Sequence, residues 1–430
     1  MSPTTEQRLK AEFPDLIYTK LTPVSKADFF NYPGWHPSTT ILQSGHVKEP
    51  GRRAFSHETV FERDVAVTMR DGVTLYVDIF RPCDSDSTKV PALIPWSPYG
   101  KTGSGPHEYE TMGPHSCGVP REHTSGYEKF EGPDPAEWIK RGYAIVNVDA
   151  RGAGNSEGDI HWFGIQEAED IYDTIDWLTK QPWCDGSVAM IGSSWLAVAQ
   201  INFASRLKHP ALKALAPMEA FNDPYRDVVA RGGRRHHSKF FEVIMGGFAG
   251  PGFVEDMPAM LQTHPLFDDY WQSKYIDTSR IDVPLYLTAS YSSGLHVAGS
   301  FNTFRTAKTK QKWLRVHSHQ EWYDLYRADI TDELQRFFDR FCKNIDNNWE
   351  TDIPPVRLSL LGFDGSPAKT IRERAENEYP LARQKLTRYY LDSRNRSLLK
   401  ENPSSPSQTS HESHSLTSAS VSPSFADSPK

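Results

Sequence analysis

From residue 135 to residue 342 the chain alternates short apolar runs with segments of helical period. The expected strands are 143–148, 187–191, 212–217, 283–289 and 313–316. The expected helices are 135–141, 166–180, 195–207, 298–307 and 331–342. Strands that alternate with helices form a largely parallel sheet covered by helices on both faces. The alternation therefore predicts an α/β fold.

The segments before this alternation are also patterned. Residues 61–69 and 74–82 alternate apolar and polar side chains around Arg70-Asp71-Gly72, which predicts a β-hairpin. Residues 90–96 form a short apolar strand, and the stretch 101–133 is rich in Gly, Pro and His. Loops of that length inside compact domains tend to bind ligands or cover sites.

These patterns divide the chain. Residues 1–60 are expected to be an N-terminal extension laid over an α/β core at 61–220 and 281–345. Residues 221–280, rich in Gly, His, aromatics and Pro, interrupt the core and are expected to form a cap. Isolated strand-like runs at 350–400 predict a partial β-domain. Residues 401–430 are mostly Ser, Pro, Thr and His, a composition that cannot form a core and predicts disorder.

Composition excludes several classes of function. The 430 residues carry a net charge of −7 without a large basic block, which argues against nucleic-acid binding. No apolar run approaches the ~18 residues of a membrane span, and residues 1–15 lack the apolar core of a secretory signal. The four cysteines have no metal-like spacing, so reduced thiols in a cytoplasmic protein are expected. No cofactor or metal is expected, and a homo-oligomer is compatible with these patterns.

One turn in the alternation carries chemistry. The apolar strand at 187–191 runs into Gly192-Ser193-Ser194 and then directly into an expected helix. A strand that ends in Gly-x-Ser before a helix is typical of a nucleophile elbow, which lifts a serine hydroxyl clear of the sheet. The full motif has a second glycine where this chain has Leu196, so the match is partial. An ordinary turn is the alternative interpretation.

A histidine pair follows the last strand of the alternation. His317 and His319 come directly after residues 313–316. In α/β-hydrolase sheets the chain order is nucleophile, acid and histidine, with the last two on loops after later strands. The position of this pair fits a general base for Ser194, although histidines also fall after strands by chance.

Several segments together resemble the cocaine esterase and X-Pro dipeptidyl-peptidase-like serine hydrolases, which are α/β-hydrolases. The segments are Arg70-Asp71-Gly72-Val73-Thr74-Leu75, Pro98-Tyr99-Gly100-Lys101, residues 138–143, residues 149–158, residues 169–173, residues 181–186 and residues 191–196. The resemblance implies cleavage of an ester or amide, with Ser194 as nucleophile and His319 as general base. His317 is the second choice for the base.

The resemblance also implies an oxyanion hole. The family uses a tyrosine hydroxyl after the third strand and the backbone N–H that follows the nucleophile. Here these would be the Tyr99 hydroxyl and the Trp195 N–H. A phenol and an amide N–H that point at one developing oxyanion stabilise it strongly where water is excluded.

The chain departs from the family at the catalytic acid. The family's aspartate belongs in the segment that is Ala289-Ser290-Tyr291-Ser292-Ser293-Gly294 here, and no aspartate occurs between Asp282 and Asp324. A serine can orient an imidazole but cannot stabilise an imidazolium by charge. Substitute acids are Glu219, Asp223 and Glu321, of which the first two lie in a run that favours a structural role.

The C-terminus departs as well. Such hydrolases usually close with a full β-sandwich domain, and residues 350–400 correspond only to the opening of one. The expected fold is therefore an α/β-hydrolase with an inserted cap and a truncated C-terminal β-sandwich-like segment.

Other polar clusters favour structural interpretations. Charged groups that gather after a strand, here Asp149, Arg151 and Asp170, usually form a supporting network. The basic cluster in the expected cap is more typical of a solvated face than of a carboxylate site; it comprises Arg231, Arg234, Arg235, His236, His237 and Lys239. Three loop histidines lack carboxylate or thiol partners at metal-ligand spacing; they are His107, His115 and His123.

The sequence thus predicts a serine hydrolase that acts on a small molecule or a short peptide. Two alternatives stay open: a catalytically impaired homologue that binds a ligand or partner, and an enzyme of acyl transfer in a biosynthetic pathway. The substrate is not encoded in the fold, because specificity lies in loops and the cap.

Overall fold

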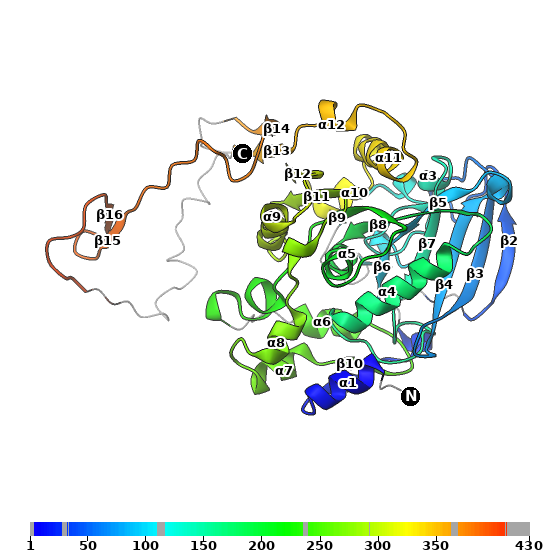
Figure 1. Ribbon diagram of the computed structural model, residues 1–430, viewed down its shortest axis with the longest axis horizontal. Coiled ribbons are helices and arrows are strands. Elements are labelled where there is room, and N and C mark those ends of the chain that lie inside the picture. Colours follow the sequence, from blue (N-terminus) through cyan, green and yellow to red (C-terminus); the bar gives the residue numbers. More distant parts are fainter. Residues whose placement is uncertain are drawn as a thin grey trace.

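A twelve-stranded mixed sheet forms the centre of the computed structural model (Figure 1). The structure describes residues 4–27, 32, 34–109, 117–234, 240–291, 293–362, 369–408 and 410. The strands in spatial order are β14 (Ile371–Glu376), β13 (Val356–Leu360), β12 (Lys312–His317), β11 (Leu285–Ser290), β9 (Leu212–Met218), β8 (Cys184–Ser193), β5 (Val90–Ile94), β7 (Ala144–Asp149), β4 (Thr74–Pro82), β3 (Thr59–Thr68) and β2 (Ser38–Leu42), with β6 (Trp96–Ser97) paired to β7.

Strand direction divides the sheet into two parts. The strands from β2 to β7 pair antiparallel, and the expected hairpin is the β3–β4 pair. From β7 to β13 every pair is parallel. The parallel part confirms the α/β prediction, because each of its strands is buried on both faces and needs a crossover to the next.

Helices cover both faces of the parallel part. On one face pack α4 (Ile165–Leu178), α5 (Trp195–Arg206) and α9 (Val297–Thr306), and on the other α3 (Pro135–Ile139) and α11 (Ala328–Cys342). Alternate residues of β8 divide between these faces: Val188 and Met190 join the first layer, and Ala189 and Ile191 join the second. This alternation is the period of two that a strand imposes on its side chains.

The order in which successive strands are added to the sheet reverses at β5. Strand β5 lies between β7 and β8, so β7 is added on one side of β5 and β8 is then added on the other. Such a switch point opens a crevice at the carboxyl ends of the neighbouring strands, where ligands bind in open α/β sheets. Tyr99 follows β6 and Ser194 follows β8, so both expected site residues lie at this crevice.

The segment 221–280 is folded from short elements beside the sheet. They are η6 (Pro224–Val229), η7 (Arg231–Gly233), α6 (Phe240–Gly247), β10 (Phe253–Glu255), α7 (Met257–Thr263), α8 (Asp269–Lys274) and η8 (Thr278–Arg280). An N-terminal strand, β1 (Tyr18–Lys20), pairs antiparallel with β10. Near it lies α1 (Thr5–Glu12), and Figure 1 shows α1, α7 and β10 together at one edge of the molecule.

The remaining short elements connect the larger ones. They are η1 (Val24–Lys26), η3 (Cys83–Asp86), α2 (Pro106–Tyr109), η5 (Arg121–His123), α10 (Glu321–Leu325) and α12 (Trp349–Asp352). Within the described residues, no helix has the length and apolar character needed to cross a membrane.

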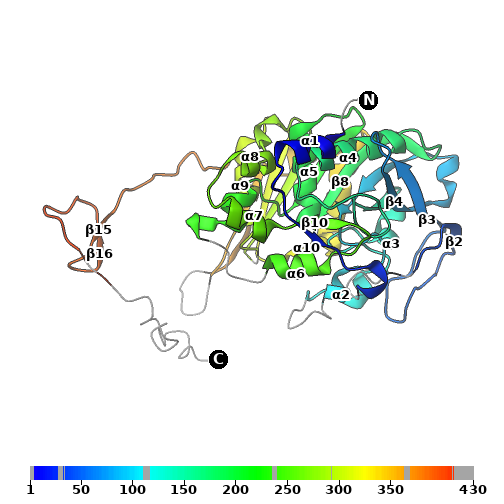
Figure 2. The same cartoon turned by 90° about the horizontal axis from the view of Figure 1, so that it is seen from below.

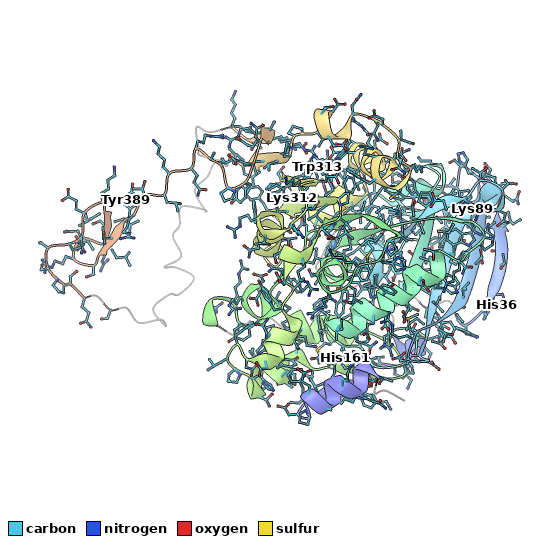
Figure 3. All side chains as sticks on the ribbon, in the orientation of Figure 1. His36, Lys89, His161, Lys312, Trp313 and Tyr389 are labelled. Atoms are coloured by element: carbon cyan, nitrogen blue, oxygen red, sulfur yellow. The ribbon has the colours of Figure 1, made fainter. Side chains whose placement is uncertain are left out.

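The strand-like runs after residue 350 have two arrangements. β13 joins the main sheet parallel to β12, and β14 pairs antiparallel with β13. β15 (Tyr390–Asp392) and β16 (Ser397–Leu399) pair only with each other, apart from the main sheet (Figures 1 and 2). Figure 3 shows Tyr389 on this outlying part, where it is 48% exposed, whereas Trp313 of β12 is 5% exposed. The strand-like runs expected at 350–400 therefore include strands of the main sheet and a short, largely exposed pair outside it.

Candidate active site

The turn after β8 has the geometry of a nucleophile elbow. Ser194 has φ 54° and ψ −119°, a region that side-chain-bearing residues rarely adopt, and it is the N-cap of α5. Strained backbone of this kind persists only where its surroundings fix it. Here the Ser194 N–H donates to the Glu219 carbonyl oxygen at 3.2 Å, and the Ser193 N–H donates to the Glu131 carbonyl oxygen at 3.0 Å.

Gly192 makes the close approach within this turn. Its φ is 136°, and a Cβ built there would lie 2.5 Å from Leu196 Cδ2 and 2.9 Å from the Glu131 carbonyl oxygen. Leu196 stands where the full motif has a glycine, and it is fully buried over Gly192. The elbow therefore has one of the two glycines of the full motif. At the position of the second, the buried Leu196 side chain packs over Gly192.

A cavity with about 410 Å³ of empty space opens above Ser194. Tyr99, Trp195 and His296 line it together with Ser194. The other lining residues are all apolar or aromatic: Trp162, Phe163, Phe221, Pro224, Val228, Val229, Phe241, Ile244 and Met257. The structure thus brings together three of the four residues that the sequence singled out, namely Ser194, Tyr99 and Trp195.

Tyr99 and Trp195 lie side by side at the switch point. Their ring centroids are 6.2 Å apart, and both side chains are almost fully buried. The Trp195 indole N–H donates to Glu167 Oε1 at 2.9 Å, which fixes the ring. Trp195 is the first residue of α5, and the first N–H groups of a helix have no acceptor within the helix. Its N–H is therefore suited to binding a developing oxyanion.

His296, which the sequence did not single out, is the imidazole in this cavity. It precedes α9 as its N-cap and is 4% exposed. Its ring stacks on Phe221, with centroids 5.8 Å apart and planes 3° apart. Its Nδ1 lies 2.5 Å from Ser293 Oγ and 3.7 Å from Glu321 Oε2. The apolar residues around it fix the ring plane, and the polar contacts fix one of its nitrogens.

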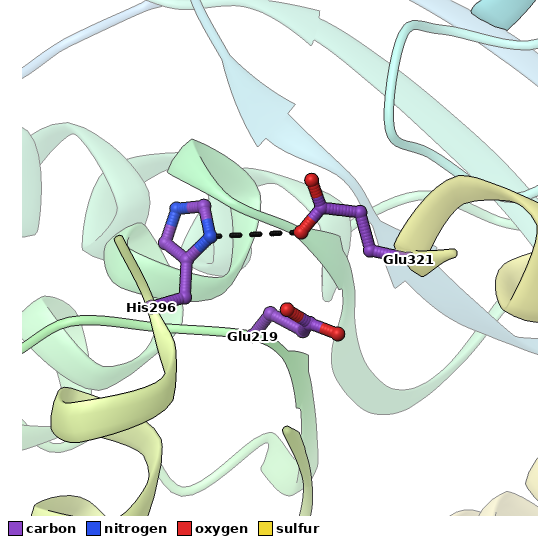
Figure 4. Close-up of side chains that lie close together, drawn as sticks. All are labelled: Glu219, His296 and Glu321. Carbon is purple, nitrogen blue, oxygen red and sulfur yellow. Dashed lines mark ion pairs between the residues drawn. The ribbon is translucent and has the colours of Figure 1, made fainter. Parts of the chain in front are cut away.

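Two carboxyl groups, Glu219 and Glu321, adjoin this imidazole (Figure 4). One ligand-type atom from each of the three side chains lies within 4.8 Å of the others. Burial and the charge of Glu321 raise the pKa of Glu219 well above its usual range. Burial also acts to raise the pKa of Glu321, but the interactions with His296 and Glu219 outweigh it and leave the pKa lowered. These directions favour a neutral Glu219 beside an ionised Glu321.

Glu131 is a third buried carboxyl group at the elbow. Burial raises its pKa well above the usual value, while the Trp322 indole and the Ser194 hydroxyl act to lower it. The Trp322 Nε1–H donates to Glu131 Oε1 at 2.9 Å. Glu131 also has a positive φ of 63°. No sequence motif marks it, because its contribution to the elbow comes from its carbonyl group and its burial.

The structure does not bring His319 to this cavity. β12 ends at His317, and the following residues turn outward before α10 begins at Glu321. His319 lines a separate hollow that also contains Arg327 and Arg372, and its Nε2 lies 3.3 Å from an Arg372 nitrogen. Burial and Arg327 lower the pKa of His319. The choice of His319 rests on the family's spacing after the last strand, and that spacing does not specify the direction of the loop.

His317 lies closer to the acid cluster than His319 does. Its Nε2 is 3.2 Å from Glu219 Oε1 and 3.6 Å from Asp324 Oδ2, and the side chain is almost fully buried. Burial lowers the pKa of His317 to about 4, so the ring is neutral near neutral pH. It lines the same separate hollow as His319.

The remaining charged groups have structural contacts. Asp223 caps η6 by accepting from the Arg226 N–H at 2.9 Å. Arg151 makes two buried hydrogen bonds to Asp170, at 2.8 and 2.6 Å. Asp149 lies against Gly154, and burial raises its pKa to about 7 despite the lysines beside it.

Two expected clusters are only partly described. Arg231 donates to the Gly294 carbonyl oxygen at 2.6 Å, while residues 235–239 of the basic cluster lie outside the described residues. Of the loop histidines, His107 contacts Arg52 and the Val119 carbonyl oxygen, and His115 lies outside the described residues.

The strand order, the switch point and the strained serine define an α/β-hydrolase. Residues 71–250 match the X-Pro dipeptidyl-peptidase (S15) family. This match and the relatives below support the resemblance to the cocaine esterase and X-Pro dipeptidyl-peptidase-like hydrolases.

Two relatives illustrate the extent of this similarity. The cocaine esterase of a Rhodococcus strain is 27% identical over 397 residues, which cover 76% of this chain and 62% of the relative. A CocE/NonD family hydrolase from Staphylococcus aureus superposes with a TM-score of 0.74 at 32% identity, over 89% of this chain and 65% of that one. The chain therefore spans a little under two thirds of the length of either relative.

A more distant structure shares the fold alone. It is an aminopeptidase from a Thaumarchaeota archaeon, with a TM-score of 0.50 at 18% identity, over 79% of this chain and 62% of that one. The family points to an esterase- or peptidase-type hydrolase, and a protein that only binds a ligand is not favoured by these relatives.

Proposed function

We propose that this chain is a serine hydrolase that cleaves an ester or amide through an acyl-enzyme on Ser194. The observation that carries the proposal is the strained Ser194 at the floor of a cavity that Tyr99 and Trp195 also line. A hydroxyl held on an elbow, with two hydrogen-bond donors nearby, is the arrangement that acyl transfer requires.

The proposed reaction has two halves. The Ser194 Oγ bonds to the substrate carbonyl carbon, its proton passes to an imidazole, and the carbonyl electron pair moves onto the oxygen. The Tyr99 hydroxyl and the Trp195 N–H donate to that oxyanion. The imidazolium then protonates the leaving alcohol or amine as its bond to carbon breaks. Water attacks the acyl-enzyme by the same steps, and the proton returns to Ser194 as the acid leaves.

The lining of the cavity supports an apolar acyl group. Apart from Ser194, Tyr99 and His296, the lining residues found in the described part of the chain offer only hydrocarbon and aromatic surface. A peptide substrate with a free N-terminal ammonium would need a carboxylate partner for that charge. No carboxylate belongs to this described lining. We therefore propose esters or amides of uncharged, aromatic or aliphatic acids as substrates.

The segment 221–280 contributes much of this apolar wall. Pro224, Val228, Val229, Phe241, Ile244 and Met257 all come from it. We propose that this segment acts as the cap expected from the sequence, because it lies over Ser194 and excludes water from the oxyanion. Its residues, rather than those of the sheet, would then set specificity.

Labelling with a fluorophosphonate probe tests the proposal. An activated serine reacts covalently with the probe, and a dead homologue does not. We expect the native protein to be labelled and the Ser194→Ala protein to lose both labelling and hydrolysis of an aromatic ester. Ser193→Ala is the matched control, because Ser193 is also buried but is the residue before the nucleophile. Labelling that persists in Ser194→Ala would refute the proposal.

A further inference from the structure

By the family resemblance, Ser293 lies in the segment that carries the catalytic aspartate, and in the structure it contacts a histidine. Its hydroxyl oxygen lies 2.5 Å from Nδ1 of His296, three residues further along the chain. Ser293 is 5% exposed, so water competes little for this bond. The neutral side chain that replaced the acid therefore still holds an imidazole, but the imidazole is not His319.

We propose that His296 is the general base for Ser194, and that Ser293 and Glu321 together replace the missing aspartate. Ser293 orients the ring, and Glu321 supplies the negative charge. This inference rests on the proposed function, and it assigns to the reaction three residues that strand order alone does not indicate.

The position of the ring supports the role of His296. Its Nδ1 is engaged with Ser293. The same nitrogen faces Glu321, as Figure 4 shows. The two nitrogens of an imidazole lie on different edges of the ring, so Nε2 is the atom left for the cavity. Ser194 and His296 line that cavity together. The stacking on Phe221 keeps the ring in this plane.

The position of Glu321 supplies what Ser293 lacks. Its Oε2 lies 3.7 Å from Nδ1 of His296, close enough for a strong charge interaction in a buried site. The Ser293 hydroxyl also interacts with Glu321. His296 Nδ1, the Ser293 hydroxyl and the Glu321 carboxylate thus interact in sequence. Such an arrangement is expected when one residue orients the imidazole and another supplies the negative charge, both of which an aspartate would do alone.

Glu219 completes the cluster as a neutral neighbour. Burial and the charge of Glu321 raise the pKa of Glu219, which favours its neutral form beside the imidazole. Its Oε1 also lies 3.2 Å from Nε2 of His317. Glu219 also accepts the Ser194 N–H through its backbone carbonyl, which links the cluster to the elbow.

Proton movement in the proposed site is balanced. His296 Nε2 takes the proton of the Ser194 hydroxyl as the C–O bond forms, and its Nδ1 proton stays bonded to Ser293. The positive ring is stabilised by Glu321 until Nε2 delivers the proton to the leaving group. No proton has to move onto Glu321.

Substitution of the histidines gives the first test. We expect His296→Ala to lower kcat on an aromatic ester by about 10³- to 10⁴-fold, with Tm unchanged. Added imidazole should restore part of the rate, which loss of a purely structural residue would not allow. His319→Ala, the matched control, should stay within about twofold of native. Loss in His319→Ala with full activity in His296→Ala would overturn the assignment.

Relocation of the charge gives the second test. Glu321→Gln should lower kcat by about 10²-fold or more, because the imidazolium loses its counter-charge. The double variant Ser293→Asp with Glu321→Gln places one carboxylate against Nδ1 and should recover most of that loss. A double variant no better than Glu321→Gln would overturn the division of roles. Because the comparison is between two variants, it stands even if His296→Ala does not fold.

The same three side chains could instead hold a divalent cation, since two carboxylates and an imidazole are metal ligands. Stoichiometric metal in the purified protein, with activity lost in EDTA and restored by that metal, would overturn the proposal. Activity that survives EDTA supports it.

The Ser194→Ala protein separates failure of the proposed function from failure of this inference. An active Ser194→Ala protein refutes the proposed function, whereas inactive Ser194→Ala beside active His296→Ala refutes only this inference.

Discussion

The carboxyl ends of β8 and β12 use polar residues in different ways. At the end of β8 the backbone itself is specialised, since Ser194 holds a positive φ and Gly192 leaves room for Leu196. At the end of β12 the backbone is ordinary, and ion pairs carry the structure. Arg315 is fully buried and bonds Asp324 at 2.6 and 3.1 Å. We infer that the β8 end serves the proposed reaction and that the β12 end supports the structure.

This difference shows which features a sequence reveals. A backbone conformation that few residues tolerate leaves a local mark, here Gly-x-Ser between a strand and a helix. The choice of ion-pair partner leaves no such local mark in the sequence. Asp324 lies in α10, and it reaches Arg315 through the packing of that helix. His319, two residues beyond β12, therefore resembles a catalytic residue in the sequence, while in the structure its Nε2 lies 3.3 Å from a nitrogen of Arg372.

Among the changes that compare these two strand ends, a side chain placed at Gly192 should have the largest effect. Gly192→Ala would place a methyl group 2.5 Å from Leu196 Cδ2, and the backbone beside Ser194 would have to shift. We expect fluorophosphonate labelling to fall by about 10²-fold or more, as expected when a reacting group is misplaced by an ångström. Labelling rates measured on folded protein test this.

Gly186→Ala is the control at the other end of β8. Gly186 also has a positive φ, of 86°, but nothing lies within 4 Å of its absent Cβ. Only the backbone cost of about 1 kcal/mol is expected there, without loss of labelling. Equal labelling of both variants would show that the elbow does not depend on the close approach.

Removal of the Tyr99 hydroxyl should have the next largest effect. Tyr99→Phe deletes one oxyanion donor and should lower kcat by about 10²-fold, with KM little changed. Tyr323→Phe is the matched change near the end of β12, where the ring of Tyr323 contacts His319. It should leave kcat within about twofold. A kinetic comparison of the two variants on one ester decides whether the oxyanion hole lies at the β8 end.

How much the sequence could predict depends on the same distinction. The hairpin, the alternation and the elbow follow from local patterns, and the structure confirms the α/β-hydrolase fold. The elbow motif indicates Ser194, the family resemblance indicates Tyr99 and Trp195, and all three line one cavity. Neither signal indicates His296, which we propose as the general base, because the segment before α9 shows a serine where the family has an acid. A search for any histidine within one turn of Ser293 would have found it.

Disruption of the ion pair at the β12 end should affect stability rather than rate. Asp324→Asn leaves the Arg315 guanidinium without its main buried partner, which typically costs about 3–5 kcal/mol. Chemical denaturation should show this loss, while kcat per folded molecule stays within about threefold. A large loss of kcat without a loss of stability would instead place this strand end in the reaction.

The same pair gives a dependence on pH with a definite sign. Arg315 and its neighbours hold the pKa of Asp324 below the usual value, although burial acts to raise it. A carboxyl group with a lowered pKa stabilises the fold above its unfolded pKa of about 3.9 and loses that contribution as the pH falls through the folded value. The stability difference between native and Asp324→Asn proteins should therefore be full at pH 7 and shrink below about pH 4.

Deletion of residues 402–430 should have the smallest effect. Their composition offers almost no large apolar side chain, and most of them lie outside the described residues. We expect Tm and kcat to stay within experimental error. A shift of Tm by several degrees would show that this segment docks on the enzyme and that its composition misleads.

The pairing of β1 with β10 has a consequence for how the protein is made. During synthesis β1 leaves the ribosome long before its partner, and it has no strand to bind until β10 has emerged. β10 lies two residues before Met257, which helps to line the cavity above Ser194. A segment that precedes the α/β core in the chain is thus paired only after much of that core has been made. The cavity above Ser194 acquires this part of its wall only after most of the α/β core has been translated.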